Sequence, residues 1–199
     1  MKTKFFTGKG DDGTSDMGGG VCMNKDSGYA ELLGALDELN SWTGLCRARA
    51  AREHQLKKEE LPVAIVPTLR QIQELLFIAQ AEIAVCAASA LGIAESVSGN
   101  KHITPRHTTF LEEVIHKVDK EVPPLTHFVI PGASELSAMI DVARVTARRV
   151  ERTAVALHRA KKLPEPILPF LNRLSSVFFA LARYINHCMN VPEEFPRYE

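Results

Sequence analysis

Apolar residues recur three and four positions apart along most of the chain, which is the spacing of one face of a helix. Turn residues and prolines interrupt this pattern at intervals. The pattern predicts five helices, at residues 28–50, 64–91, 105–122, 134–162 and 169–190. Only the few residues of Phe128-Val-Ile could be extended. The expected fold class is all-α: a five-helix bundle with a core of the ferritin-like, four-helix-bundle type plus one helix.

The two ends of the chain lack the helical pattern. Residues 1–27 are rich in Gly and Asp and are expected to form a loop. Residues 191–199 are polar, contain proline and are expected to be a loose tail. A length of 199 residues fits one domain, so we interpret 1–199 as a single domain whose bundle spans 28–190.

Charge and cysteine usage narrow the class of protein. Lys+Arg and Asp+Glu number 24 each, so the net charge is +0 and no overall field favours nucleic acid or a membrane surface. The N-terminus lacks a signal-peptide pattern, and the most apolar stretch, 83–94, is too short to span a bilayer. The four cysteines have no metal-ligand spacing, which is typical of reduced thiols in a cytoplasmic protein. Glu113-x-x-His116 is only half of a di-iron signature, so no protein metal site is predicted.

An arginine-rich block in the fourth predicted helix is the first candidate for chemistry. Arg144, Arg148 and Arg152 recur every four residues and so share one helix face, with Glu151 beside Arg148. Like charges at this spacing repel each other unless an anion meets them, and a guanidinium binds phosphate or carboxylate through two hydrogen bonds. The alternative is a solvated helix face whose Arg stems cover apolar neighbours.

A glycine-rich segment near the N-terminus is the second candidate. Its glycines allow the backbone to approach an anion closely, and its hydroxyls and lysine suit phosphate. The residues concerned are Thr7, Gly8, Lys9, Gly10, Asp11, Gly13, Thr14 and Ser15. A P-loop is not predicted, because no Lys follows Gly13 and no strand precedes the segment. A flexible glycine-rich terminus is the alternative.

Polar residues also interrupt two apolar helices. Asp37, in Asp37-Glu-Leu-Asn-Ser, lies mid-helix beside a leucine stripe, where Asp is a poor helix former, so it is either solvated or paired with a cation. Asn172 begins a polar stripe along the last predicted helix. That stripe indicates either a lined cleft or ordinary hydrogen bonding between helices.

Taken in order, these segments resemble the trimeric five-helix ATP:cob(I)alamin adenosyltransferases. Several linked motifs carry the resemblance and cover nearly the whole chain. They are the glycine-rich loop with Lys25 after it, Asp37-Glu-Leu-Asn-Ser, Phe128-Val-Ile-Pro-Gly-Ala, the block from Arg144 to Arg152, and Asn172-Arg-Leu-Ser. Their order makes the resemblance far more specific than any single motif.

The resemblance implies a reaction in which the 5′-deoxyadenosyl group of ATP is transferred to cob(I)alamin, giving adenosylcobalamin and triphosphate. It also implies ATP, Mg²⁺ and cobalamin as ligands, and a homotrimer with active sites at the subunit interfaces. The cobalt of the substrate is then the nucleophile, so the protein needs no nucleophilic Ser, Cys or His.

Roles for individual residues follow from the same resemblance. Asp37 would pair with Arg144 of a neighbouring subunit beside the corrin, and Phe128 would lie under cobalamin and exclude a lower axial ligand. The catalytic set implied is Arg148, Asp37, Arg144 and Phe128. The set implied for ATP and its Mg²⁺ is the loop (Thr7, Gly8, Lys9, Gly10, Asp11, Gly13, Thr14 and Ser15) with Lys25, Arg148, Glu151, Arg152 and Asn172.

The chain also departs from the family pattern. Gly8 stands in place of a basic residue, Leu33 of Tyr, Ala133 of Gly, Asp141 of His and Ser176 of Asp. Charge lost near a triphosphate weakens its binding. The alternative function is therefore a nucleotide- or corrinoid-binding sensor or carrier on the same trimeric bundle, without turnover.

Overall fold

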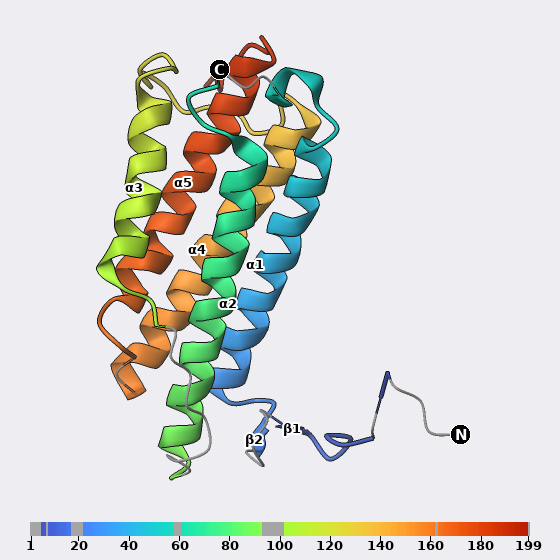
Figure 1. The fold of residues 1–199 in the computed structure, drawn as a ribbon, viewed down its shortest axis with the longest axis vertical. Helices are drawn as coiled ribbons and strands as arrows, with labels where there is room; N and C mark the ends of the chain where they lie inside the picture. The colour runs from blue at the N-terminus through green and yellow to red at the C-terminus, as the bar shows by residue number, and fades with distance from the viewer. Residues whose placement is uncertain are drawn as a thin grey trace.

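In the part of the chain that the structure describes, five α-helices form one elongated bundle, as predicted (Figure 1). The computed structural model describes residues 5–6, 8–16, 22–57, 61–92, 102–161 and 163–198. The helices are α1 (Gly28–Ala50), α2 (Ile65–Ala90), α3 (Pro105–Asp119), α4 (Glu135–Lys161) and α5 (Ile167–Cys188). Helix α4 packs against both α1 and α5, while α2 covers α1 and α3 covers α5. We call the end at which α1 begins the foot of the bundle and the end at which α4 begins its head (Figure 1).

The predicted apolar stripes meet in a single core. In α5 the three-and-four spacing places six apolar residues on one face, and all six are fully buried: Leu171, Leu174, Val177, Phe178, Leu181 and Ile185. In α1 the same spacing predicts that Leu45 belongs to the apolar face, and this prediction is wrong, because its side chain is 46% exposed. The buried stripe of α1 continues through Thr43 and Cys46 instead, and Leu45 lies one residue away, which turns it about 100° from that face.

Two helix boundaries differ from the prediction because of prolines. Helix α5 begins at Ile167, so Pro169 lies in its first turn, where a missing N–H removes no helical hydrogen bond. Helix α3 ends at Asp119 instead of residue 122. Beyond Asp119 the chain forms a turn in which the Val122 N–H donates to the Val118 carbonyl. The helix does not continue past this turn, because a residue that precedes proline disfavours the helical region.

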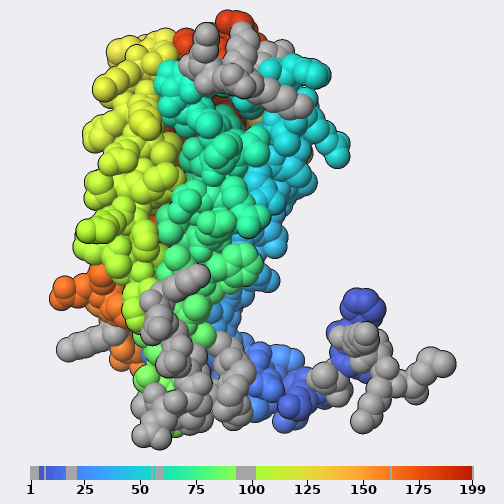
Figure 2. Space-filling view, viewed as in Figure 1, coloured from blue at the N-terminus to red at the C-terminus, as the bar shows by residue number. Residues whose placement is uncertain are grey.

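The N-terminal region contains structure that the sequence pattern did not predict. Strands β1 (Thr14–Asp16) and β2 (Cys22–Asn24) form an antiparallel hairpin at the foot of the bundle. Three-residue strands are too short to be recognised by alternation. Figure 2 shows this segment reaching outward from the foot instead of lying along the helices. A 3₁₀ helix, η1 (His54–Lys57), interrupts the predicted charged loop after α1.

The C-terminal tail is attached to the head of the bundle, so the prediction of a loose tail was wrong. The Ile130 N–H donates to the Glu194 carbonyl at 2.8 Å, and these two residues form an isolated β-bridge. The Val191 N–H also donates to the Asn186 carbonyl at 2.9 Å. Backbone pairing between distant segments leaves no signal in either segment alone.

Helix α2 is long and apolar enough to cross a membrane by length and composition alone. The core helix of a bundle meets the same test, and α2 buries Ile65, Leu69, Ile72 and Ile83 completely against its neighbours. This single helix is therefore weak evidence for a membrane protein.

Candidate functional site

The glycine-rich loop has a defined shape that depends on glycine. Gly8, Gly10 and Gly13 have φ angles of 74°, 86° and 87°, in the region that other residues rarely adopt. A Cβ atom on Gly10 would lie 2.5 Å from the Thr14 carbonyl oxygen, so no larger residue fits there without rearrangement. Asp12 accepts hydrogen bonds from the Thr14 N–H at 3.0 Å and from the Thr14 hydroxyl at 2.7 Å. These bonds lower the pKa of Asp12, because they stabilise its charged form.

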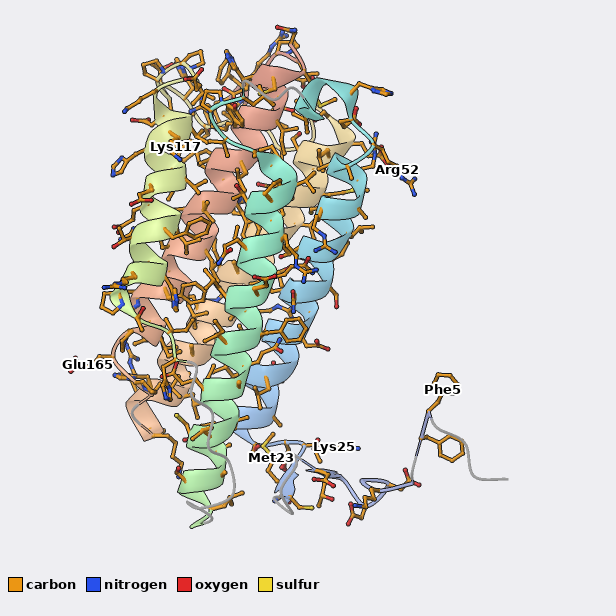
Figure 3. All side chains as sticks on the ribbon, in the orientation of Figure 1. Phe5, Met23, Lys25, Arg52, Lys117 and Glu165 are labelled. Atoms are coloured by element: carbon orange, nitrogen blue, oxygen red, sulfur yellow. The ribbon has the colours of Figure 1, made fainter. Side chains whose placement is uncertain are left out.

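Lys25 joins the loop to the start of α1, as the predicted site requires (Figure 3). Its ammonium group donates to the Gly10 carbonyl at 2.7 Å, and its backbone N–H donates to the Gly13 carbonyl at 3.0 Å. Lys9 pairs with Asp16 at 3.4 Å and stays largely exposed. Two cations thus lie on a loop whose backbone is already curved. Thr7, which was predicted to contribute, lies outside the described residues.

The arginine block does not form the single ridge of three free cations that the spacing predicted. Arg144 is bound by Asp141, through Nε to Oδ1 at 2.6 Å and Nη2 to Oδ2 at 3.3 Å. Arg148 and Arg152 are exposed and have no ion pair among the described residues. Because neither is paired with a carboxylate in the described part of the chain, these two guanidinium groups of the block can meet an anion.

Glu151 and Asn172 are brought together from α4 and α5. The Asn172 amide donates through Nδ2 to Glu151 Oε1 at 2.7 Å. Glu151 therefore orients Asn172, and it forms no ion pair with Arg148, its neighbour on the helix face, among the described residues. The remaining carboxylate oxygen of Glu151 and the amide oxygen of Asn172 have no hydrogen-bond partner among the described residues. Two such oxygens suit Mg²⁺, which takes one or two protein oxygens and completes its shell with phosphates and water.

Asp37 and Arg144 of the same chain lie at different heights along the bundle. Glu38 of α1 forms an ion pair with Arg149 of α4, which sets the register of these two antiparallel helices. Asp37 lies one residue from Glu38 toward the foot, and Arg144 lies five residues from Arg149 toward the head. The six residues of offset correspond to about 9 Å along the axis at about 1.5 Å per residue. Asp37 is exposed and makes no ion pair among the described residues.

The segment between α3 and α4, which carries Phe128, lies at the head of the bundle, at the opposite end from the glycine-rich loop (Figure 1). The side chain of Phe128 is 78% exposed. A shallow apolar pocket of about 380 Å³ is lined by Leu125, Thr126, His127, Phe128, Pro196 and Tyr198. One chain thus holds the loop with Lys25 at one end, the Arg148 region along α4, and Phe128 at the other end.

Two residues of this arrangement were not among those predicted to contribute. Asp141 was noted only as a departure from the family pattern, although its spacing of three residues from Arg144 on a helix predicts an ion pair. Asp12 was not predicted to contribute, although Asp two residues before Thr14 is the signal for a side-chain-capped turn. Both signals were present in the local sequence.

Known proteins are similar to this chain in sequence and in fold. The sequence profile of the family described as "Cobalamin adenosyltransferase" matches residues 5–185. A corrinoid adenosyltransferase of Bacillus subtilis is 33% identical over 183 residues, which are 92% of this chain and 86% of that protein. The human corrinoid adenosyltransferase MMAB is 31% identical over 188 residues, which are 91% of this chain and 68% of that protein.

Solved structures give the same result in three dimensions. A variant PduO-type ATP:corrinoid adenosyltransferase from Lactobacillus reuteri, complexed with cobalamin and ATP, superposes with a TM-score of 0.79 at 31% identity. The match covers 98% of this chain and 99% of that one. A second variant from the same organism, complexed with ATP, gives a TM-score of 0.77 at 30% identity and covers 96% and 99% of the two chains.

Proposed function

The chain belongs to the cobalamin adenosyltransferase family, and on this premise we propose that it transfers the 5′-deoxyadenosyl group of ATP to cob(I)alamin with release of triphosphate. The observation that carries the proposal is the group formed by Arg148, Arg152, Glu151 and Asn172. It combines two uncompensated guanidinium groups with two free oxygens on adjacent helices. Such a set can meet both a polyphosphate and the Mg²⁺ that accompanies it.

The proposed chemistry makes modest demands on the protein. Cobalt, as part of the substrate, attacks the 5′ carbon of ATP, the carbon–oxygen bond to triphosphate breaks, and triphosphate leaves with the electron pair. Negative charge therefore builds on the leaving group in the transition state. Arg148 and Arg152 stabilise that charge, and Lys25 with the loop backbone binds the outer phosphates. Catalysis then comes from cations placed in advance and not from a protein nucleophile.

We further propose that the active enzyme is a homotrimer in which each site lies between subunits. The geometry of one chain supports this assembly, because Phe128, expected to meet the corrin, lies at the head and the loop, expected to meet ATP, lies at the foot. One chain alone therefore keeps the two groups apart. Asp37 is also offset from Arg144 of its own chain by about 9 Å along the bundle axis. Arg144 uses Nε and Nη2 for Asp141, so Nη1 stays open to a carboxylate such as Asp37 from a neighbouring subunit. Closed threefold symmetry allows every subunit to make the same contact.

A binding protein without turnover is the second candidate, and one observation favours it. Asp141 neutralises Arg144 within the chain, whereas a family member with His at this position has a less compensated arginine. Gly8 also leaves the loop with one basic residue fewer than the family pattern. Either change weakens a site that depends on charge. A sensor or carrier would retain ATP and corrinoid affinity and would release no triphosphate.

The deciding experiment supplies ATP and Mg²⁺ with chemically reduced cobalamin under anaerobic conditions and follows the absorption change to adenosylcobalamin. We expect formation of adenosylcobalamin and an equal amount of triphosphate. Binding of both ligands with no triphosphate would favour the sensor instead. Mass measurement in solution at micromolar concentration tests the trimer, and a monomer would contradict it.

The proposal extends to organisation and location. We propose that residues 1–199 act as one domain, with 1–27 as the nucleotide-binding loop, 28–190 as the bundle and 191–199 as the tail. We also propose that the enzyme works in the cytoplasm, where ATP is abundant and its four cysteines stay reduced; none of them forms a disulfide in the part of the chain that the structure describes. Fractionation of cells that express the protein would test this location.

A further inference from the structure

A partly buried ion pair joins the C-terminal tail to α5 at the head of the bundle. Arg183 of α5 donates through Nε to Glu193 Oε1 at 2.7 Å and through Nη2 to Glu193 Oε2 at 3.0 Å. The two side chains are only 11% and 19% exposed. A paired guanidinium and carboxylate with both hydrogen bonds formed, largely out of water, is among the stronger polar contacts of a protein. Loss of one partner leaves the other charge buried and uncompensated.

The same ion pair reaches both ends of the segment that carries Phe128. Arg183 Nη2 also donates to the Pro123 carbonyl at 2.9 Å, at the start of that segment. At the other end the Ile130 N–H donates to the carbonyl of Glu194, the residue after Glu193. One arginine and two consecutive tail residues therefore anchor residues 123 and 130.

Packing contributes little to the position of Phe128 between these anchors. The side chain is 78% exposed, and its neighbour His127 makes a tilted ring contact with Phe195 of the tail at 5.6 Å. Because no core contact holds Phe128, its place depends on where the ends of segment 123–130 are fixed. The tail supplies one of those ends and the ring contact beside it.

We propose that Arg183 and Glu193 are positioning residues for the corrinoid: their ion pair clasps the tail and segment 123–130 together and so holds Phe128 in place. This inference rests on the proposed function in one respect, because it takes Phe128 as the residue that meets the corrin. Arg183 and Glu193 themselves do not touch the reacting atoms. Their effect should therefore fall on corrinoid binding and not on ATP.

The test is Glu193→Gln in the full-length protein, which removes the charge and keeps the shape. We expect the amide of Ile130 to exchange with deuterium at least about tenfold faster, because its acceptor lies on the released tail. We also expect the KM for cobalamin to rise at least fivefold while the KM for ATP stays within twofold. Arg197→Gln is the matched control, because this exposed tail charge has no ion pair among the described residues; it should leave all three values unchanged.

A double variant decides whether the clasp acts through Phe128. If it does, Phe128→Ala with Glu193→Gln should raise the KM for cobalamin no further than Phe128→Ala alone. Three outcomes would each overturn the proposal. They are additive effects of the two substitutions on the KM for cobalamin, equal changes in both KM values in Glu193→Gln, and unchanged exchange at Ile130 in Glu193→Gln. A wild-type protein without turnover would instead overturn the proposed function, and the exchange rate at Ile130 would still test whether the ion pair holds segment 123–130.

Discussion

Arg148→Ala is the substitution that most directly tests the proposed triphosphate site. Arg148 is exposed on α4 and makes no ion pair among the described residues, so its removal breaks no ion pair there. A charged hydrogen bond contributes about 1.5–3 kcal/mol. If Arg148 binds the leaving group as its charge builds, the barrier rises by a similar amount, and each ~1.4 kcal/mol lowers turnover about tenfold. We therefore expect kcat to fall between about tenfold and a hundredfold.

The assay measures adenosylcobalamin formation at saturating ATP and cobalamin, together with the melting temperature and the mass of the assembly. Arg148→Lys should recover only part of the loss, because an ammonium group cannot reproduce two parallel hydrogen bonds. Arg159→Ala, an exposed arginine near the end of the same helix, is the control and should behave as the wild type. Near-normal kcat in a correctly assembled Arg148→Ala protein would refute the reasoning and move the triphosphate elsewhere.

Three further predictions concern the loop and the thiols. Gly10→Ala should raise the KM for ATP at least about tenfold, because a residue other than glycine at this positive φ is strained by on the order of 1–3 kcal/mol and its Cβ meets the Thr14 carbonyl. An unchanged melting temperature would localise the effect to the loop, and an unchanged KM would contradict the prediction. The hydrogen bonds from Thr14 lower the pKa of Asp12, so they stabilise the turn at any pH above the ordinary pKa of aspartate. This stabilisation is lost as the pH falls through the lowered pKa. Titration by NMR should find a lowered pKa, and an ordinary pKa would argue against the capped turn. Burial raises the pKa of the Cys46 thiol to about 12, so at pH 8 a thiol reagent should modify the exposed Cys22 first and Cys46 only after unfolding. Peptide mass mapping would measure this order, and rapid labelling of Cys46 would be inconsistent with the buried core.

Much of the helical framework was predictable because its causes are local. Spacing of apolar residues defines a helix face, and prolines mark where a helix ends, so α1 and α2 agree with prediction to within one residue. The errors arose where a local rule had a local exception. Pro169 was taken as the first residue of a helix that begins two residues earlier, and Leu45 was assigned to an apolar face from which it is offset by one residue.

The site residues divide in the same way. The sequence alone identified the glycine-rich loop, the arginine block and Asn172, because each motif has a chemical composition that suits an anion or a cation. It did not identify which arginine is free. Which arginine is unpaired depends on which carboxylate reaches it. Asp141 forms an ion pair with Arg144, whereas no carboxylate among the described residues pairs with Arg148.

By itself, therefore, the sequence determined the helices, the core stripes and the residue types available for chemistry, since these depend on neighbours within a few positions. Only the tertiary structure decided how distant groups combine. It joined Asn172 to Glu151, placed the segment that carries Phe128 at the far end from the loop, and joined the tail to α5 through Arg183 and Glu193. The reason is physical: a hydrogen bond between segments depends on the packing of whole helices, and no short stretch of sequence contains that information.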